Sequence, residues 1–134
     1  MTAVILFACV HNAGRSQMAA AWLSRLANLE RAQGLSAGTE PATAVHPVVQ
    51  VAMAEVGIDL SSAVPRRLTA ELLETVTHLF TMGCGEACPV APPGVARADW
   101  PLADPKGGSL EAVRAIRDEI RERVAALIAE NGWG

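Results

Sequence analysis

The sequence predicts an α/β fold, in which a parallel sheet is covered by helices on both faces. Strand-like and helix-like segments alternate along the 134 residues, and the first strand, residues 4–8, is a continuous apolar run. Such a run is typical of a strand buried on both faces of a parallel sheet, with crossover helices packed on either side. We therefore expect one three-layer domain over residues 1–134, with residues 4–8 at the centre of its sheet.

Four helices are expected around this sheet. Residues 17–30 are rich in Ala, Leu and Met and contain no Pro or Gly, which predicts a helix directly behind the first strand and its loop. Residues 47–56 begin with proline and carry apolar residues at helical spacing, and residues 70–74 form a shorter candidate. The last helix has the strongest pattern, because one apolar stripe runs between an N-cap at Ser109 and a stop at Gly132.

Three further segments are expected to complete the sheet. They lie at residues 33–38, 77–81 and 95–99, and the last has the weakest pattern. The proline-rich residues 89–94 read as a loop within the domain. No repeat or linker divides the chain.

The composition limits the classes of function. The chain is 51% hydrophobic and 19% charged with a net charge of -3, and its basic residues are scattered, so we expect no nucleic-acid partner. No basic residue precedes the apolar start, which favours a strand over a signal peptide or a membrane span. We therefore expect a cytoplasmic protein without a membrane partner. Its three cysteines then indicate redox, metal or catalytic chemistry in place of a static disulfide framework.

Residues 9–16 have the pattern of an oxyanion-binding loop. They follow the first strand and open the first helix, where backbone N–H groups of a loop converge on one point. We expect Asn12 and Gly14 to supply the positive φ angles that such a curl requires. The guanidinium of Arg15 is suited to two parallel hydrogen bonds with an anion. The expected anion-binding residues are Val10, His11, Asn12, Ala13, Gly14, Arg15 and Ser16.

Cys9 has two readings. It is either a small buried hydrophobe, with Arg15 as a surface charge, or a nucleophile beneath the bound anion. The position after an apolar strand and before a helix favours the nucleophile. Positive surroundings would also favour its thiolate form, and Ser16 is placed to donate a hydrogen bond to that thiolate.

The stretch CVHNAGRSQMA resembles the phosphate-binding loop of the low-molecular-weight protein tyrosine phosphatase superfamily, and is most similar to its arsenate reductase branch. Further similar motifs occur in the same order as in that family: SAGTEP at 36–41, AVHP at 44–47, VGIDLSS at 56–62, TMGCGEACP at 81–89 and DWPLADPKG at 99–107. The resemblance implies a low-molecular-weight phosphatase-like fold, with a four-stranded parallel sheet flanked by helices. It also implies displacement at a tetrahedral oxyanion by the Cys9 thiolate.

The resemblance makes Asp104 the general acid that protonates the leaving oxygen. Pro105 stiffens the loop that carries it, which suits this role. Asp99 is the competing carboxylate, and either residue could instead be a solvated loop side chain.

Cys84 and Cys88 separate the two branches of the family. In an arsenate reductase a second thiol attacks the cysteinyl arsenate, so the resemblance implies a relay from Cys9 to Cys84 to Cys88. The alternatives are a zinc pair, which lacks its other ligands, or two inert loop thiols. We expect no metal and no bound cofactor. The external reductant would be thioredoxin, or mycothiol with a mycoredoxin. The second possibility follows from the motifs HNAGRS and MGCGEACP, which resemble those of actinobacterial-type reductases.

The sequence therefore predicts an arsenate reductase that takes arsenate, with phosphate or sulfate as competing oxyanions. The alternative is a phosphatase that hydrolyses phosphomonoesters through a cysteinyl phosphate. Lys106 counts against the phosphatase, because eukaryotic members of the family place an aromatic residue there. A third reading is an oxyanion-binding protein without catalysis, which the presence of Cys9, Arg15 and Asp104 disfavours.

Overall fold

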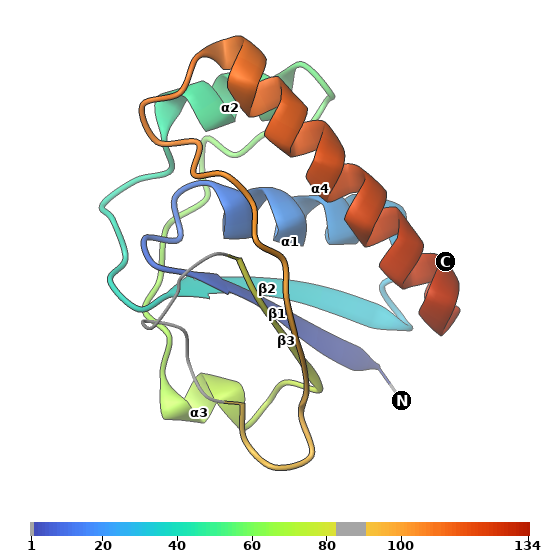
Figure 1. Ribbon diagram of the computed structural model, residues 1–134. Helices are drawn as coiled ribbons and strands as arrows, with labels where there is room; N and C mark the ends of the chain where they lie inside the picture. Colours follow the sequence, from blue (N-terminus) through green and yellow to red (C-terminus); the bar gives the residue numbers. More distant parts are fainter. Residues whose placement is uncertain (1, 83–90) are drawn as a thin grey trace.

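A computed structural model describes residues 2–82 and 91–134, which form four parallel strands and four helices (Figure 1). The strands are β1 (Ala3–Cys9), β2 (Ala32–Gly38), β3 (His78–Thr81) and β4 (Ala96–Asp99). The helices are α1 (Arg15–Leu26), α2 (Pro47–Ala54), α3 (Ala70–Leu73) and α4 (Leu110–Asn131). The strand order is β2-β1-β3-β4. The predicted α/β class, the four-stranded parallel sheet and the interior position of the first strand are confirmed.

The helices cover the two faces of the sheet unequally. Helices α1, α2 and α4 lie on one face, and the short α3 lies on the other (Figure 1). The larger core cluster includes Phe7, Trp22 and Ile120, on β1, α1 and α4. The smaller cluster, around Leu6 and Leu79, packs on the α3 side. Because successive side chains of β1 point to opposite faces, its continuous apolar sequence fills both clusters.

The strand register aligns the carboxyl ends of the strands. Cys9, the last residue of β1, pairs with Gly38 of β2, and Ala8 pairs with Thr81 of β3. Ligand sites of open parallel sheets form beyond this edge. Residues 9–16 therefore begin where such a site is expected.

Helix α1 differs from its prediction at both ends. It spans Arg15–Leu26, whereas residues 17–30 were expected. It ends early because Ala27 takes an extended conformation with ψ of 156°. The N–H of Asn28 then donates to the carbonyl of Trp133 at 2.7 Å. A contact with the far end of the chain thus determines where the helix stops.

Helix α4 has the predicted caps. The Ser109 side chain accepts a hydrogen bond from the N–H of Ala112, and Gly132 takes the left-handed conformation with φ of 69°. Its apolar stripe includes the fully buried Val113, Ile120 and Val124. Within the described ranges, no helix meets the length and hydropathy that a bilayer span requires.

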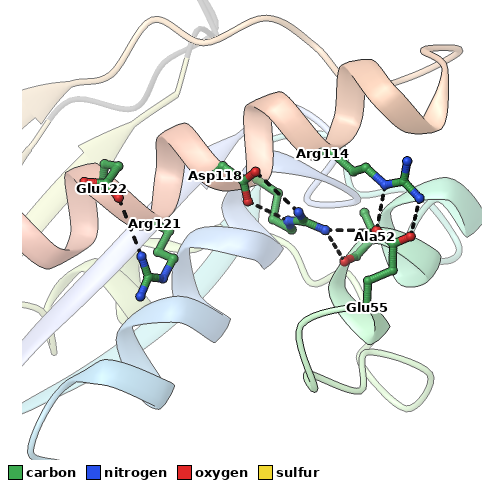
Figure 2. A network of polar contacts seen from close by, with 7 residues as sticks. Ala52, Glu55, Arg114, Asp118, Arg121 and Glu122 are labelled. Atoms are coloured by element: carbon green, nitrogen blue, oxygen red, sulfur yellow. Dashed lines mark hydrogen bonds and ion pairs between the residues drawn. The ribbon is translucent and has the colours of Figure 1, made fainter.

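An ion-pair cluster joins α2 to α4 on the same face of the sheet. Figure 2 shows Glu55, just after α2, facing Arg114 of α4. Arg114 Nε donates to Glu55 Oε1 at 2.8 Å, and Arg117 Nη1 donates both to Glu55 Oε1 at 3.0 Å and to the Ala52 carbonyl at 2.8 Å. Asp118 pairs with the other side of Arg117 at 2.8 Å. This α2–α4 clamp (Glu55, Arg114, Arg117 and Asp118) holds α2 against the longest helix.

Candidate active site

The 9–16 loop is held from outside by the segment that follows β2. Carbonyl groups at positions 9, 10, 11 and 13 accept hydrogen bonds of 2.8 to 3.2 Å from backbone N–H groups at positions 39, 40, 42 and 46, respectively. With these carbonyl groups turned outward, the N–H of Asn12 points at the sulfur of Cys9, at 3.3 Å. The loop therefore has the inward-facing polarity that binds an anion.

Two residues were predicted to supply positive φ angles, and only one does so. Asn12 has φ of 51°, whereas Gly14, the N-cap of α1, has φ of -145°. Gly14 is required by space: a Cβ built there would lie 2.6 Å from Pro105 Cγ and 3.5 Å from His46 Cδ2. The prediction that Gly14 supplies a positive φ was therefore wrong. The reason for a glycine here is the close approach of the loop that carries Pro105, which is a tertiary contact.

Cys9 lies beneath this loop and is 4% exposed. Its sulfur is 2.9 Å from Ser16 Oγ. It opens into a small cavity of about 10 Å³ whose lining residues are Cys9, His11, Ala13, Gly14, Arg15, His46 and Asp104. The structure thus brings together the predicted nucleophile, the predicted arginine and the predicted acid.

Arg15 and Asp104 come from different segments of the chain and both line the cavity. Arg15 Nη1 donates to the carbonyl of Leu102 at 2.9 Å, and its Nη2 lies 3.9 Å from Asp104 Oδ2. The Arg15 side chain is buried, whereas the Asp104 side chain is 52% exposed. The loop before α4 therefore anchors the arginine and also carries the carboxyl group.

Asp99, the competing carboxylate, lies elsewhere. It ends β4, and its Oδ1 accepts a hydrogen bond of 2.7 Å from Thr81 Oγ1. It does not line the cavity that holds Cys9. Geometry therefore favours Asp104 over Asp99 as the acid.

His46 is a cavity residue that the sequence reasoning missed. Its N–H caps the Ala13 carbonyl at 2.9 Å, and its side chain lies beside Gly14. Burial lowers the pKa of His46 below its ordinary 6.5, against an opposing effect of Asp104. The motif AVHP places this histidine directly before an N1 proline, but the contact of that helix start with Gly14 has no local signal.

Cys84 and Cys88 lie outside the described residues. The described chain reaches Met82, whose N–H donates to the carbonyl of Ala8 at 3.0 Å. Among the residues that the structure does describe, no group of three or more His, Cys, Asp or Glu side chains is placed to share a metal ion.

A cysteine under a curled strand–loop–helix turn, with an arginine and a carboxyl group beside it, defines an α/β protein with a thiol-based oxyanion site. The chain belongs to the low molecular weight phosphotyrosine protein phosphatase family, whose sequence model matches residues 4–131.

Individual relatives agree with this assignment. Arsenate reductase 1 of Bacillus cereus is 37% identical over 131 residues, which cover 96% of this chain and 95% of the relative. Among solved structures, a thioredoxin-dependent arsenate reductase of Corynebacterium glutamicum superposes with a TM-score of 0.83 at 37% identity; the match covers 98% of this chain but 62% of that longer protein. The arginine phosphatase YwlE of Geobacillus stearothermophilus gives a TM-score of 0.83 at 29% identity, covering 96% of this chain and 92% of YwlE.

Proposed function

We propose that this protein is an arsenate reductase whose reaction begins at Cys9. The observation that carries the proposal is the setting of the Cys9 sulfur, which receives the Asn12 N–H and shares one cavity with Arg15 and Asp104. The similarity to arsenate reductases along nearly the whole chain supports arsenate as the oxyanion.

The first step is displacement at arsenic. Arsenate binds to the loop N–H groups and to Arg15, and the Cys9 thiolate attacks the arsenic atom. A sulfur–arsenic bond forms as one arsenic–oxygen bond breaks. The departing group is a hydroxyl of arsenate; it takes a proton from Asp104 and leaves as water, so that arsenic remains pentavalent at this stage.

The second step is reduction by a second thiol. The Cys84 thiolate attacks the Cys9 sulfur, the sulfur–arsenic bond breaks, and its electron pair stays on arsenic, which leaves as arsenite. Cys88 then attacks Cys84 and frees Cys9. Met82, two residues before Cys84 in the sequence, lies beside β1, which supports this relay.

An external thiol reductant closes the cycle. A thioredoxin-type dithiol would reduce the Cys84–Cys88 disulfide, as supported by the similarity to a thioredoxin-dependent reductase. Mycothiol with a mycoredoxin is the alternative, in which the small thiol attacks the arsenylated Cys9 directly. Either route needs reduced cysteines, so we propose the cytoplasm as the location.

The test is a single turnover without external reductant. Arsenate added to the reduced protein should give one equivalent of arsenite and a Cys84–Cys88 disulfide, detected by mass spectrometry. The Cys88→Ser variant should still release arsenite but accumulate a Cys9–Cys84 disulfide, and Cys9→Ser should release none. Free thiols throughout, with arsenite formed only after mycothiol is added, would eliminate the relay.

The similarity to an arginine phosphatase keeps hydrolysis as a second candidate function. A phosphatase would use the same first step and then hydrolyse the cysteinyl phosphate with water. Turnover of p-nitrophenyl phosphate without any thiol, together with no arsenite formation, would reverse the ranking of the two functions.

A further inference from the structure

Gln17 is a buried polar side chain that the proposed reaction does not use. It lies in the first turn of α1 and is 6% exposed. Its Nε2 donates to the backbone carbonyl of Asn12 at 3.1 Å and to Asn12 Oδ1 at 3.2 Å. Because a backbone carbonyl can only accept, the amide of Gln17 has one orientation, with its nitrogen toward Asn12.

The orientation of the Asn12 amide is also fixed by a backbone group. The N–H of Arg66 donates to Asn12 Oδ1 at 2.9 Å. An N–H cannot accept, so the oxygen of the Asn12 amide must face Arg66 and its nitrogen must face the opposite side. On that side Asn12 Nδ2 donates to Ser16 Oγ at 2.8 Å.

The Ser16 hydroxyl group links the Asn12 amide to the Cys9 sulfur. Ser16 is fully buried, and because its oxygen accepts from Asn12 Nδ2, its own proton must point elsewhere. The other partner of Ser16 Oγ among the described residues is Cys9 Sγ, at 2.9 Å, and when Cys9 is a thiolate only the hydroxyl group can donate in this contact. A hydrogen bond donated to sulfur favours the thiolate over the thiol, since it stabilises the charged form.

We propose that Gln17 is a positioning residue that holds Asn12, and through it Ser16, in the arrangement that stabilises the Cys9 thiolate. The proposal rests on Cys9 as the nucleophile of the proposed function, but not on the identity of the oxyanion. Gln17 also bonds the carbonyl of Asn12, so it supports the left-handed backbone at that residue, whose φ is 51°.

Other charged and titratable groups face the same sulfur. His11 and Arg15 belong to its own loop, His46 precedes α2, and Asp104 comes from the loop before α4. A neutral replacement of Gln17 leaves all four in place. A change in the titration of Cys9 in such a variant therefore reports on the hydrogen-bond chain.

The test is the pH profile of Cys9 alkylation by iodoacetamide in Gln17→Met, followed by mass spectrometry of the Cys9 peptide. We expect the midpoint of the profile to move upward by about half a unit to one unit, the size of one lost hydrogen bond. Gln33→Met is the matched control, because the Gln33 side chain is exposed and donates only to the Leu29 carbonyl at 3.3 Å. Its midpoint should equal that of the unmodified protein.

A double variant separates positioning from general loosening of the core. If Gln17 acts through Ser16, adding Gln17→Met to Ser16→Ala should move the midpoint no further, because the donor is already gone. Fully additive shifts, or an unchanged midpoint in folded Gln17→Met, would overturn the proposal. Gln17→Leu repeats the measurement if the methionine variant does not fold. Alkylation needs no arsenate, so a raised midpoint without arsenite formation would count against the proposed function alone.

Discussion

The hydrogen-bond chain beside Cys9 and the α2–α4 clamp are both polar networks, but they differ in charge and burial. Asn12 and Ser16 are neutral and completely buried. Glu55 and Arg114 are charged, with side chains 33% and 45% exposed (Figure 2). The first network contacts the sulfur of Cys9, and the second lies between two helices.

The two networks therefore respond differently to mutation and to pH. A buried neutral network tolerates no missing partner, so it fixes the direction of every donor and keeps that direction as the pH changes. A partly exposed ionic network is screened by water and depends on the ionisation of its carboxylate. We therefore expect changes around the 9–16 loop to alter reactivity, and changes in the clamp to alter stability.

Among changes that leave Cys9 in place, the largest effect on reactivity should come from Arg15→Lys. A lysine keeps the charge but loses the planar fork that donates to the Leu102 carbonyl and, in the proposed reaction, to the anion. We expect kcat/KM for arsenate to fall by roughly 10²–10³-fold, the usual loss of an oxyanion-stabilising donor. Arg25→Lys is the control, because Arg25 is exposed and, within the part of the chain that the structure describes, donates only to the Gly57 carbonyl at 3.2 Å. Equal kinetics for both variants would contradict an anion-binding role for Arg15.

A smaller effect, on both activity and stability, should come from Gly38→Ala. A Cβ at Gly38 would lie 2.5 Å from the Val10 carbonyl oxygen and 3.0 Å from the Asn12 nitrogen, so the backbone of the 9–16 loop must shift. We expect the free energy of unfolding to fall by about 1–3 kcal/mol, as for other overpacked sites. Denaturant unfolding measures the loss. Gly134→Ala, where the nearest atom is at 3.6 Å, should leave the free energy unchanged.

Features set by neighbouring residues could be predicted from the sequence. Helix α4 has its caps at Ser109 and Gly132 as expected, because capping depends on a few adjacent positions. The same holds for Cys9 at the end of a buried strand, where an apolar run meets a glycine-containing loop. The element order then brings Cys9, Arg15 and Asp104 to one edge of the sheet.

Features set by distant parts of the chain could not be predicted. The side chain of His46 enters the cavity because the start of α2 packs against Gly14, and no local pattern encodes that contact. The early end of α1 depends on Trp133, more than a hundred residues away. The orientation of Asn12 depends on the N–H of Arg66, whose side chain plays no part in that bond.

The smallest expected effect concerns the clamp and depends on pH. Hydrogen bonding from Arg114 is the main reason why the pKa of Glu55 falls from 4.5 to about 2. A depressed carboxyl pKa contributes stability that is fully present above the unfolded value and is lost as the pH falls through the folded value. Glu55→Gln should therefore unfold at a lower temperature than the unmodified protein at neutral pH. The gap should narrow as the pH drops from 4.5 toward 2.

Glu119→Gln is the matched control for this pH dependence. Among the described residues Glu119 pairs only with Arg123, at 3.1 Å within α4, and its side chain is 52% exposed. Such an exposed pair one turn apart contributes about 0.3–0.5 kcal/mol, so its removal should barely change the unfolding temperature. A gap for Glu55→Gln that stays constant down to strong acid would show that packing of α2 on α4, and not the charge of Glu55, holds the two helices together. If that gap narrows while arsenate reduction and the Cys9 alkylation profile stay unchanged, the clamp acts on stability alone, independently of the loop that carries Cys9.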